Sequence, residues 1–273
     1  MSRNKNRVGN TAQHDTSPPA ESGGGFSFVV PTEFVDLPSQ GRFYPEGHPL
    51  HNQTSIEIKQ MTAKEEDILT SRSLLKKGVA IDRLIQSLIV NRGIDPSSLL
   101  TGDRNAIVIA ARVSGYGNDY ETNVQCPACG AKQNYSFDLN SANLIRGVAR
   151  EDLGVTDNGD GTITCILPKT EVEVVARLLT GRDEGAVTTL AKSNNLVTQQ
   201  LERIIVSVNG DSSTQAIQYV SQNLPSFDSR HLRMAIKKAT PNIDLTQEFS
   251  CTECGHEQEM EVPLTADFFW PDR

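Results

Sequence analysis

Two short cysteine motifs constrain this chain more than any other feature. The segments CPACG, from Cys126 to Gly130, and CTECG, from Cys251 to Gly255, are both CxxC pairs followed by glycine. Each motif is typical of a tight turn that directs two sulfurs to one point, and two such turns supply the four thiolates of a closed tetrahedral zinc site. We therefore predict one structural zinc ion held by four ligands: Cys126, Cys129, Cys251 and Cys254.

The cysteine count favours metal ligation over a disulfide framework. The 273-residue chain has five cysteines, and the fifth, Cys165, has no partner in a similar motif. An odd and small number of cysteines is typical of a reducing, cytosol-like compartment. The N-terminus lacks the apolar region of a secretory signal, and no run of about 18 apolar residues occurs, so we expect neither secretion nor a membrane span.

Alternating polar and apolar residues flank both cysteine motifs. The first motif lies between 120–124 and 135–139, and the second between 245–250 and 257–262. Strand, turn and strand in this order predict the two β-hairpins of a zinc ribbon, one at 119–140 and one at 244–273. Since the two hairpins are far apart in the sequence, the ribbon would be discontinuous.

The charge of the chain argues against nucleic acid as the main partner. The formal net charge is −8, and Lys132 is the only basic residue near the first cysteine motif. The second motif is flanked by acidic residues that would repel phosphate, namely Glu248, Glu253, Glu257, Glu259 and Glu261. The alternative, a zinc-ribbon accessory protein that binds nucleic acid through its basic N-terminal residues, stays open at this point.

The N-terminal sixty residues divide into a tail and an arm. Residues 1–25 are polar and rich in serine, glycine and asparagine, which predicts a flexible tail. Residues 26–60 are more apolar and contain several prolines, which predicts an extended arm. Arms of this kind lie across a surface, and that surface belongs either to the same chain or to a neighbouring subunit. If the arm binds a partner, Pro38, Phe43 and Tyr44 are the expected contacts.

Helical patterns fill most of the remaining chain. Residues 61–118 show a capping box at Thr62 and apolar residues at helical spacing, which predicts an N-terminal helical unit. Within 141–243 we expect a β-hairpin after the turn at 157–161, and then helices at about 182–192, 197–208, 214–223 and 226–238. The predicted fold class is α+β, with a predominantly helical body, the discontinuous zinc-ribbon-like pair of hairpins and the extended N-terminal arm.

Three consecutive aromatic residues lie near the C-terminus: Phe268, Phe269 and Trp270. Each of these side chains can bury roughly 150–250 Å², so they are costly to leave in water. They fill either a groove in their own domain or a pocket on a partner. No phosphate-binding loop, nucleophile elbow or metalloprotease motif occurs, so we expect no enzyme activity and no small-molecule substrate.

Four separated segments resemble the hub subunit family of T4-type bacteriophage baseplates, over about residue 34 to the C-terminus. They are the arm segment 37–45, Gly102-Asp103-Arg104 at the start of an apolar helix, the first cysteine motif, and the terminal Phe268-Phe269-Trp270-Pro271. The resemblance implies a non-enzymatic protein of the contractile tail baseplate. It also implies assembly in the host cytoplasm and contacts with other baseplate or tail proteins.

Overall fold

The computed structural model describes residues 29–147, 153–183, 195–263 and 266–269. Residues Met1–Val30 and Pro31–Arg273 form two units, and the helices and strands of the described residues all belong to the second. The expected tail at 1–25, most of the expected helix at 182–192, and Trp270 lie outside the described residues.

The N-terminal arm begins and ends in paired strands. Strand β1 (Thr32–Asp36) pairs antiparallel with β2 (Ser55–Lys59), and a series of turns joins them. Gly41, in these turns, has a φ of 71°, and a Cβ there would meet the Leu50 carbonyl oxygen at 2.3 Å. The close approach of the two chain segments therefore requires glycine at this position.

A helical layer follows the arm. It consists of α1 (Ala63–Thr70), α2 (Arg72–Lys77), α3 (Ala80–Leu88), the short 3₁₀ helix η1 (Pro96–Ser98) and α4 (Thr101–Tyr116). The capping box predicted at Thr62 is present, because the Glu65 carboxylate accepts from the Thr62 backbone N–H at 3.0 Å. In α3 the buried residues Leu84, Ile85 and Leu88 form the apolar stripe that the helical spacing predicts.

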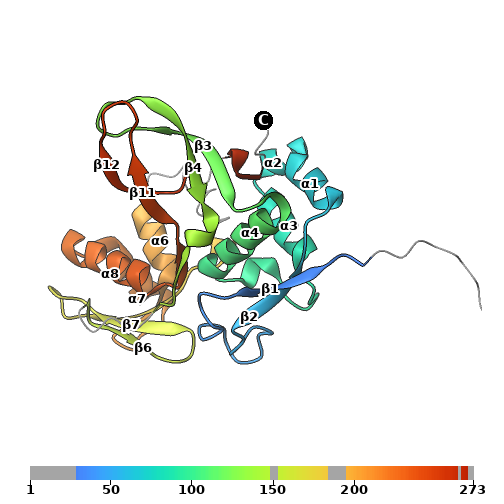
Figure 1. The fold of residues 1–273 in the computed structure, drawn as a ribbon. Coiled ribbons are helices and arrows are strands. Elements are labelled where there is room, and N and C mark those ends of the chain that lie inside the picture. The colour runs from blue at the N-terminus through green and yellow to red at the C-terminus, as the bar shows by residue number, and fades with distance from the viewer. Residues whose placement is uncertain (1–28, 148–152, 184–194, 264–265, 270–273) are drawn as a thin grey trace, which may run out of the picture. The chain divides into compact units, whose positions relative to one another are not determined.

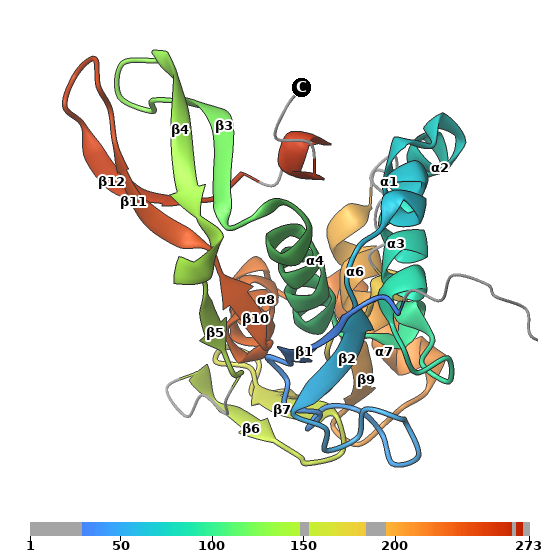
Figure 2. The ribbon, with the colours of Figure 1, turned by 45° about the vertical axis from the view of Figure 1, so that its right-hand side comes forward.

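Two antiparallel hairpins carry the cysteine motifs. Strands β3 (Asp119–Gln125) and β4 (Lys132–Asp138) form the first, and β11 (Thr246–Ser250) and β12 (Glu257–Glu261) form the second. Figures 1 and 2 show the two hairpins side by side, with both cysteine turns at the same end.

The bases of the two hairpins are joined by a further pair of strands. Strand β5 (Asn143–Ile145) follows β4 through the 3₁₀ helix η2 (Leu139–Ser141), and it pairs antiparallel with β10 (Asn242–Asp244), which precedes β11. Gly102, in the first turn of α4, packs on the same region, since a Cβ there would meet the Pro241 carbonyl oxygen at 2.1 Å. The chain between the hairpins therefore starts and ends at one place.

The described part of the segment between β5 and β10 includes a four-stranded sheet and helices. Strands β6 (Val155–Asp157), β7 (Thr162–Ile166), β8 (Glu173–Arg177) and β9 (Ile205–Val208) form an antiparallel sheet in this order. The helices are α6 (Leu196–Ile204), α7 (Thr214–Asn223) and α8 (Ser226–Ala239). The C-terminal described residues form the 3₁₀ helix η4 (Ala266–Phe269).

The expectation of a predominantly helical body is wrong. The described residues combine helices with five antiparallel sheets, so the fold is a mixed α+β structure. The helix expected at 197–208 ends at Ile204, because Ile205–Val208 is strand β9, paired with β8. Four of the five residues from Ile204 to Val208 are β-branched and favour a strand, although Ile205 and Val208 also continue the helical spacing.

The buried apolar side chains form one cluster that spans the hairpins, the helices and the four-stranded sheet. Within the described residues, no helix is both long enough and apolar enough to cross a lipid bilayer.

Candidate metal centre

The two cysteine turns have the same backbone structure. In the first, Cys126 N donates to Ala131 O at 2.8 Å and Gly130 N donates to Cys126 O at 2.8 Å. In the second, Cys251 N donates to His256 O and Gly255 N donates to Cys251 O, both at 2.9 Å. Gly130 and Gly255 have φ values of 74° and 66°, a left-handed conformation that glycine adopts at little cost. Each turn therefore presents its two sulfurs in the same way.

The four sulfurs lie together. Cys126 Sγ is 3.8 Å from Cys254 Sγ, and Cys129 Sγ is 3.8 Å from Cys251 Sγ. All four sulfurs lie within 4.8 Å of one another. A tetrahedral ion about 2.3 Å from each sulfur would hold the sulfurs about 3.8 Å apart, whereas a disulfide needs about 2.05 Å. The spacing therefore fits a shared metal ion, and all the cysteines are free thiols.

The electrostatics of the cluster also favour a cation. Backbone N–H groups, first that of Cys129, lower the pKa of the Cys126 thiol to about 6. The His256 N–H acts in the same direction on Cys254, but the neighbouring thiols, first Cys129, raise the pKa of Cys254 to about 12. The Cys126 thiolate therefore forms readily, whereas Cys254 resists ionisation beside it. A divalent cation would remove this resistance, because it offsets the repulsion between thiolates.

Side chains join the two hairpins below the sulfurs. The Gln133 amide on β4 donates to Ser250 O at 3.0 Å and accepts from Thr252 N at 3.0 Å. Tyr135, two residues along β4, donates its hydroxyl to Glu248 O at 2.8 Å. Gln247 on β11 makes two bonds with the backbone of Asp138. These bonds fix the two hairpins relative to each other, with the two cysteine turns at the same end.

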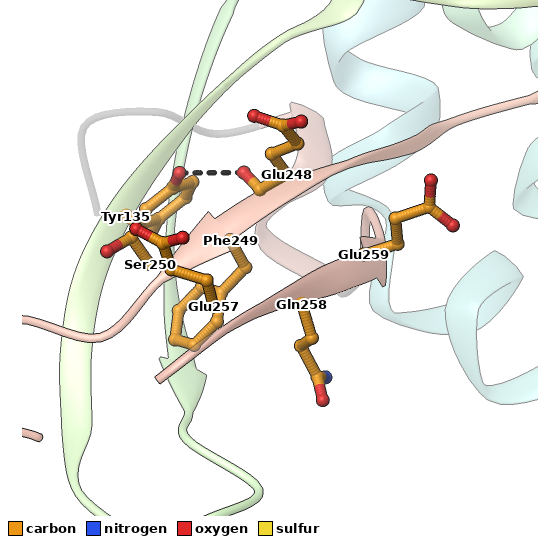
Figure 3. A pocket seen from close by; sticks show the side chains of 7 residues that line it. All are labelled: Tyr135, Glu248, Phe249, Ser250, Glu257, Gln258 and Glu259. Carbon is orange, nitrogen blue, oxygen red and sulfur yellow. Dashed lines mark hydrogen bonds between the residues drawn. The ribbon is translucent and has the colours of Figure 1, made fainter. Parts of the chain in front are cut away.

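An acidic hollow of about 500 Å³ lies beside this ribbon (Figure 3). Glu248 lies opposite Glu259, and Ser250 opposite Glu257, across the β11–β12 pair. Figure 3 shows the Tyr135 hydroxyl reaching the Glu248 carbonyl at the edge of the hollow. Among the described residues, the lining combines three carboxylates with no basic side chain, which repels phosphate and disfavours nucleic acid at this face.

The arm residues predicted as partner contacts are buried within the unit. Pro38 is buried, and the exposed fractions of Phe43 and Tyr44 are 5% and 2%. Tyr44 stacks on His48 with ring centroids 4.4 Å apart. A partner contact at these three residues stays a prediction, because in this structure their side chains are covered by other parts of the same chain.

The aromatic residues near the C-terminus are also packed against the chain itself. Phe268 and Phe269 are 3% and 4% exposed, and the Phe268 ring lies edge-on to Tyr120 at a centroid distance of 5.1 Å. Trp270 lies outside the described residues. A partner role for Phe268 and Phe269 likewise stays a prediction.

Two buried polar residues anchor these segments, and their contacts are not predicted by the sequence. Arg112 on α4 is fully buried and donates to three carbonyl oxygens, those of Phe268 at 2.6 Å, Gly117 at 2.6 Å and Asp119 at 3.1 Å. Asp103, also fully buried, accepts from Ser39 and Tyr44 of the arm. A charged residue inside an apolar helix marks both positions in the sequence, but this local pattern does not identify their hydrogen-bond partners.

The family comparison covers nearly the same residues as this unit. The family model described as T4 bacteriophage base plate protein matches residues 31–270. The chain belongs to this family. It is therefore a structural protein of a phage tail baseplate, and its partners are other phage tail proteins. No curated protein and no solved structure matches the chain.

Proposed function

We propose that this baseplate protein is a hub subunit that contributes to the tail by protein contacts alone. The family match over residues 31–270 is the observation that carries this proposal. The hub position is proposed because four segments resemble hub subunits. These are the arm, the Gly102-Asp103-Arg104 segment, the first cysteine motif and the terminal aromatic residues. The proposal includes assembly in the host cytoplasm, without catalysis and without a small-molecule substrate.

The proposal further assigns one structural zinc ion to Cys126, Cys129, Cys251 and Cys254. Thiolate ligands are soft, and four of them favour zinc over the harder cations magnesium and calcium. Four protein ligands leave no open position, so the ion would supply cross-linking and no reaction. Its charge would stabilise the thiolates, while the hairpins and the β5–β10 pair hold the turns in place.

The experiment is deletion and complementation in the phage that encodes the protein. We expect purified particles to contain this chain, and cryo-electron microscopy of their baseplates to place it at the tail axis. Normal, infective tails formed without the chain would contradict the structural role. Density on the peripheral part of the baseplate would contradict only the hub position.

A binding assay separates this proposal from nucleic-acid binding. The carboxylates of the acidic hollow beside the ribbon favour protein partners over nucleic acid. We expect no measurable affinity for DNA or RNA at low ionic strength, where electrostatic binding is strongest. Tight binding that weakens with salt would favour the nucleic-acid alternative.

A further inference from the structure

A groove of about 310 Å³ lies between α6, α8 and the start of α4, on a different part of the unit from the cysteine cluster. Three apolar side chains contribute to its surface: Leu179, Ile204 and Ile236. The other uncharged lining residues are Thr101, Gln200, Thr240 and Asn242. The groove is therefore apolar with polar groups around it, as expected for a surface that receives a side chain from a partner.

Three cations surround this groove: Arg203, Arg233 and Lys237. None of the described lining residues is acidic, although the whole chain has a formal net charge of −8. Arg233 donates its Nε to Ser229 O on its own helix. Within the described part of the chain, no ion pair or hydrogen bond engages the side chains of Arg203 or Lys237. Positive charge is thus concentrated around this apolar groove, although the protein as a whole is acidic.

We propose that this groove binds an acidic segment of another baseplate protein, with an aliphatic or aromatic residue inserted between α6 and α8. The cations select negative charge and raise the rate of association. The apolar surface adds affinity only for a ligand that has an apolar group to bury. A nucleic-acid backbone meets the first requirement and lacks such a group, so the combination favours an amphipathic acidic peptide.

This inference rests on the proposed function for the identity of the partner, but the chemistry of the groove can be tested separately. Failure of an acidic peptide with apolar residues to bind would overturn the inference and leave the role in the baseplate intact. Conversely, normal tails without the chain would contradict the baseplate role and leave the peptide result unaffected.

The probes are three fluorescein-labelled peptides of about twelve residues, measured by fluorescence polarisation with the full chain. The first combines aspartate and glutamate with leucine and phenylalanine. The second replaces the acids by asparagine and glutamine, and the third replaces leucine and phenylalanine by serine. We expect the first peptide to bind at least about tenfold more tightly than either of the others, because each lacks one of the two recognised features.

Neighbouring residues on α8 provide a matched pair of variants. Lys237 lines the groove, whereas Lys238 is exposed elsewhere on the same last helical turn. Both offset the helix dipole, so Lys238→Glu controls for that contribution. We expect Lys237→Glu to weaken binding of the first peptide by about tenfold or more, and Lys238→Glu to change it less than about twofold.

A second pair of variants removes a positive charge without reversing it, so the test does not depend on Lys237→Glu folding correctly. Arg203→Gln removes a cation of the groove, and Arg230→Gln removes an exposed one on α8 that does not line it. Provided that both variants unfold at the same temperature as the parent protein, we expect Arg203→Gln to weaken binding of the first peptide and Arg230→Gln to leave it unchanged. Equal affinity of all four variants, or equal affinity of the three peptides, would overturn the proposal. Tighter binding of single-stranded DNA than of the first peptide, with the same sensitivity to Lys237→Glu, would overturn it in favour of nucleic acid.

Discussion

Tyr44 donates its phenolic hydrogen to Asp103 Oδ2 at 2.8 Å, inside the protein. The same Tyr44 oxygen accepts from Leu100 N at 3.0 Å, and Ser39 donates to both carboxylate oxygens of Asp103. Burial raises the pKa of the Asp103 carboxyl, although the hydrogen bonds from Ser39 and Tyr44 act in the opposite direction. Two of the segments that resemble hub subunits are thus the two sides of one buried network, which joins the arm to α4.

Loss of the Asp103 carboxylate should destabilise the protein strongly. Asp103→Ala leaves buried donors of Ser39 and Tyr44 without an acceptor, at a cost of about 3 kcal/mol or more. Tyr44→Phe removes one donor and one acceptor and should cost about 1–2 kcal/mol. Urea unfolding measures both changes. The exposed Asp67 is the control, and equal unfolding free energies for Asp103→Ala and Asp67→Ala would contradict the anchoring role.

Replacement of Arg112 by lysine should release the segment that carries Phe268. The guanidinium donates to three carbonyls, and its carbon Cζ lies 5.5 Å from the Tyr116 ring centroid and 5.9 Å from that of Phe268. Lysine cannot reproduce this planar arrangement of donors, so we expect a loss of about 2–4 kcal/mol.

Hydrogen exchange provides the local measurement for Arg112→Lys. Amides at 266–269 should exchange faster than in the parent protein, while those of the four-stranded sheet change little. Arg72→Lys, at an exposed position of α2, serves as the control. Uniformly faster exchange across the sheet would indicate general destabilisation and contradict a local anchor.

Removal of one ligand cysteine should reduce metal content and stability together. Cys126→Ser or Cys254→Ser leaves three thiolates, and we expect bound zinc to fall well below one ion per chain and Tm to fall by about 10 °C or more. Elemental analysis and calorimetry measure the two quantities. A strong chelator should lower the Tm of the parent protein and leave that of the variants nearly unchanged.

Cys165 provides the matched control for the cysteine variants. It is fully buried on β7, apart from the four-cysteine cluster, and burial raises the pKa of its thiol to about 11. Cys165→Ala should retain one zinc ion per chain even if it is less stable. Full metal content in Cys126→Ser and Cys254→Ser would rule out the shared site.

The sequence predicted those features that depend on neighbouring residues. A CxxC turn, its glycine and the alternating strands on either side are local signals, and the structure brings the two turns together as one cluster. Strand β9 depends instead on pairing with β8, and Ile205 and Val208 satisfy helical and strand patterns equally well. Likewise, no local property of Asp103 identifies Ser39 as its donor, and none of Arg112 identifies the Phe268 carbonyl as an acceptor, because these partners lie in remote segments.

His48 should make stability depend on pH. Its Nδ1 accepts from Leu50 N at 3.1 Å, and its Nε2 lies 2.9 Å from Ser98 Oγ, so the ring is bound as the neutral form with a proton on Nε2. Burial lowers the pKa of His48 below its usual 6.5, and the nearby Asp95 carboxylate acts in the opposite direction. A proton on Nδ1 would break the bond from Leu50.

The sign follows from the lowered pKa. The unfolded chain binds a proton at higher pH than the folded one, so the contribution of His48 is fully present above about pH 6.5 and is lost as the pH falls through the folded pKa. We expect the unfolding free energy of the parent protein to decrease between pH 7.5 and 5, and that of His48→Gln to decrease less, because glutamine does not titrate. Urea titrations at constant ionic strength compare the two. Parallel pH profiles would mean that other groups cause the decrease, and would contradict this role of His48.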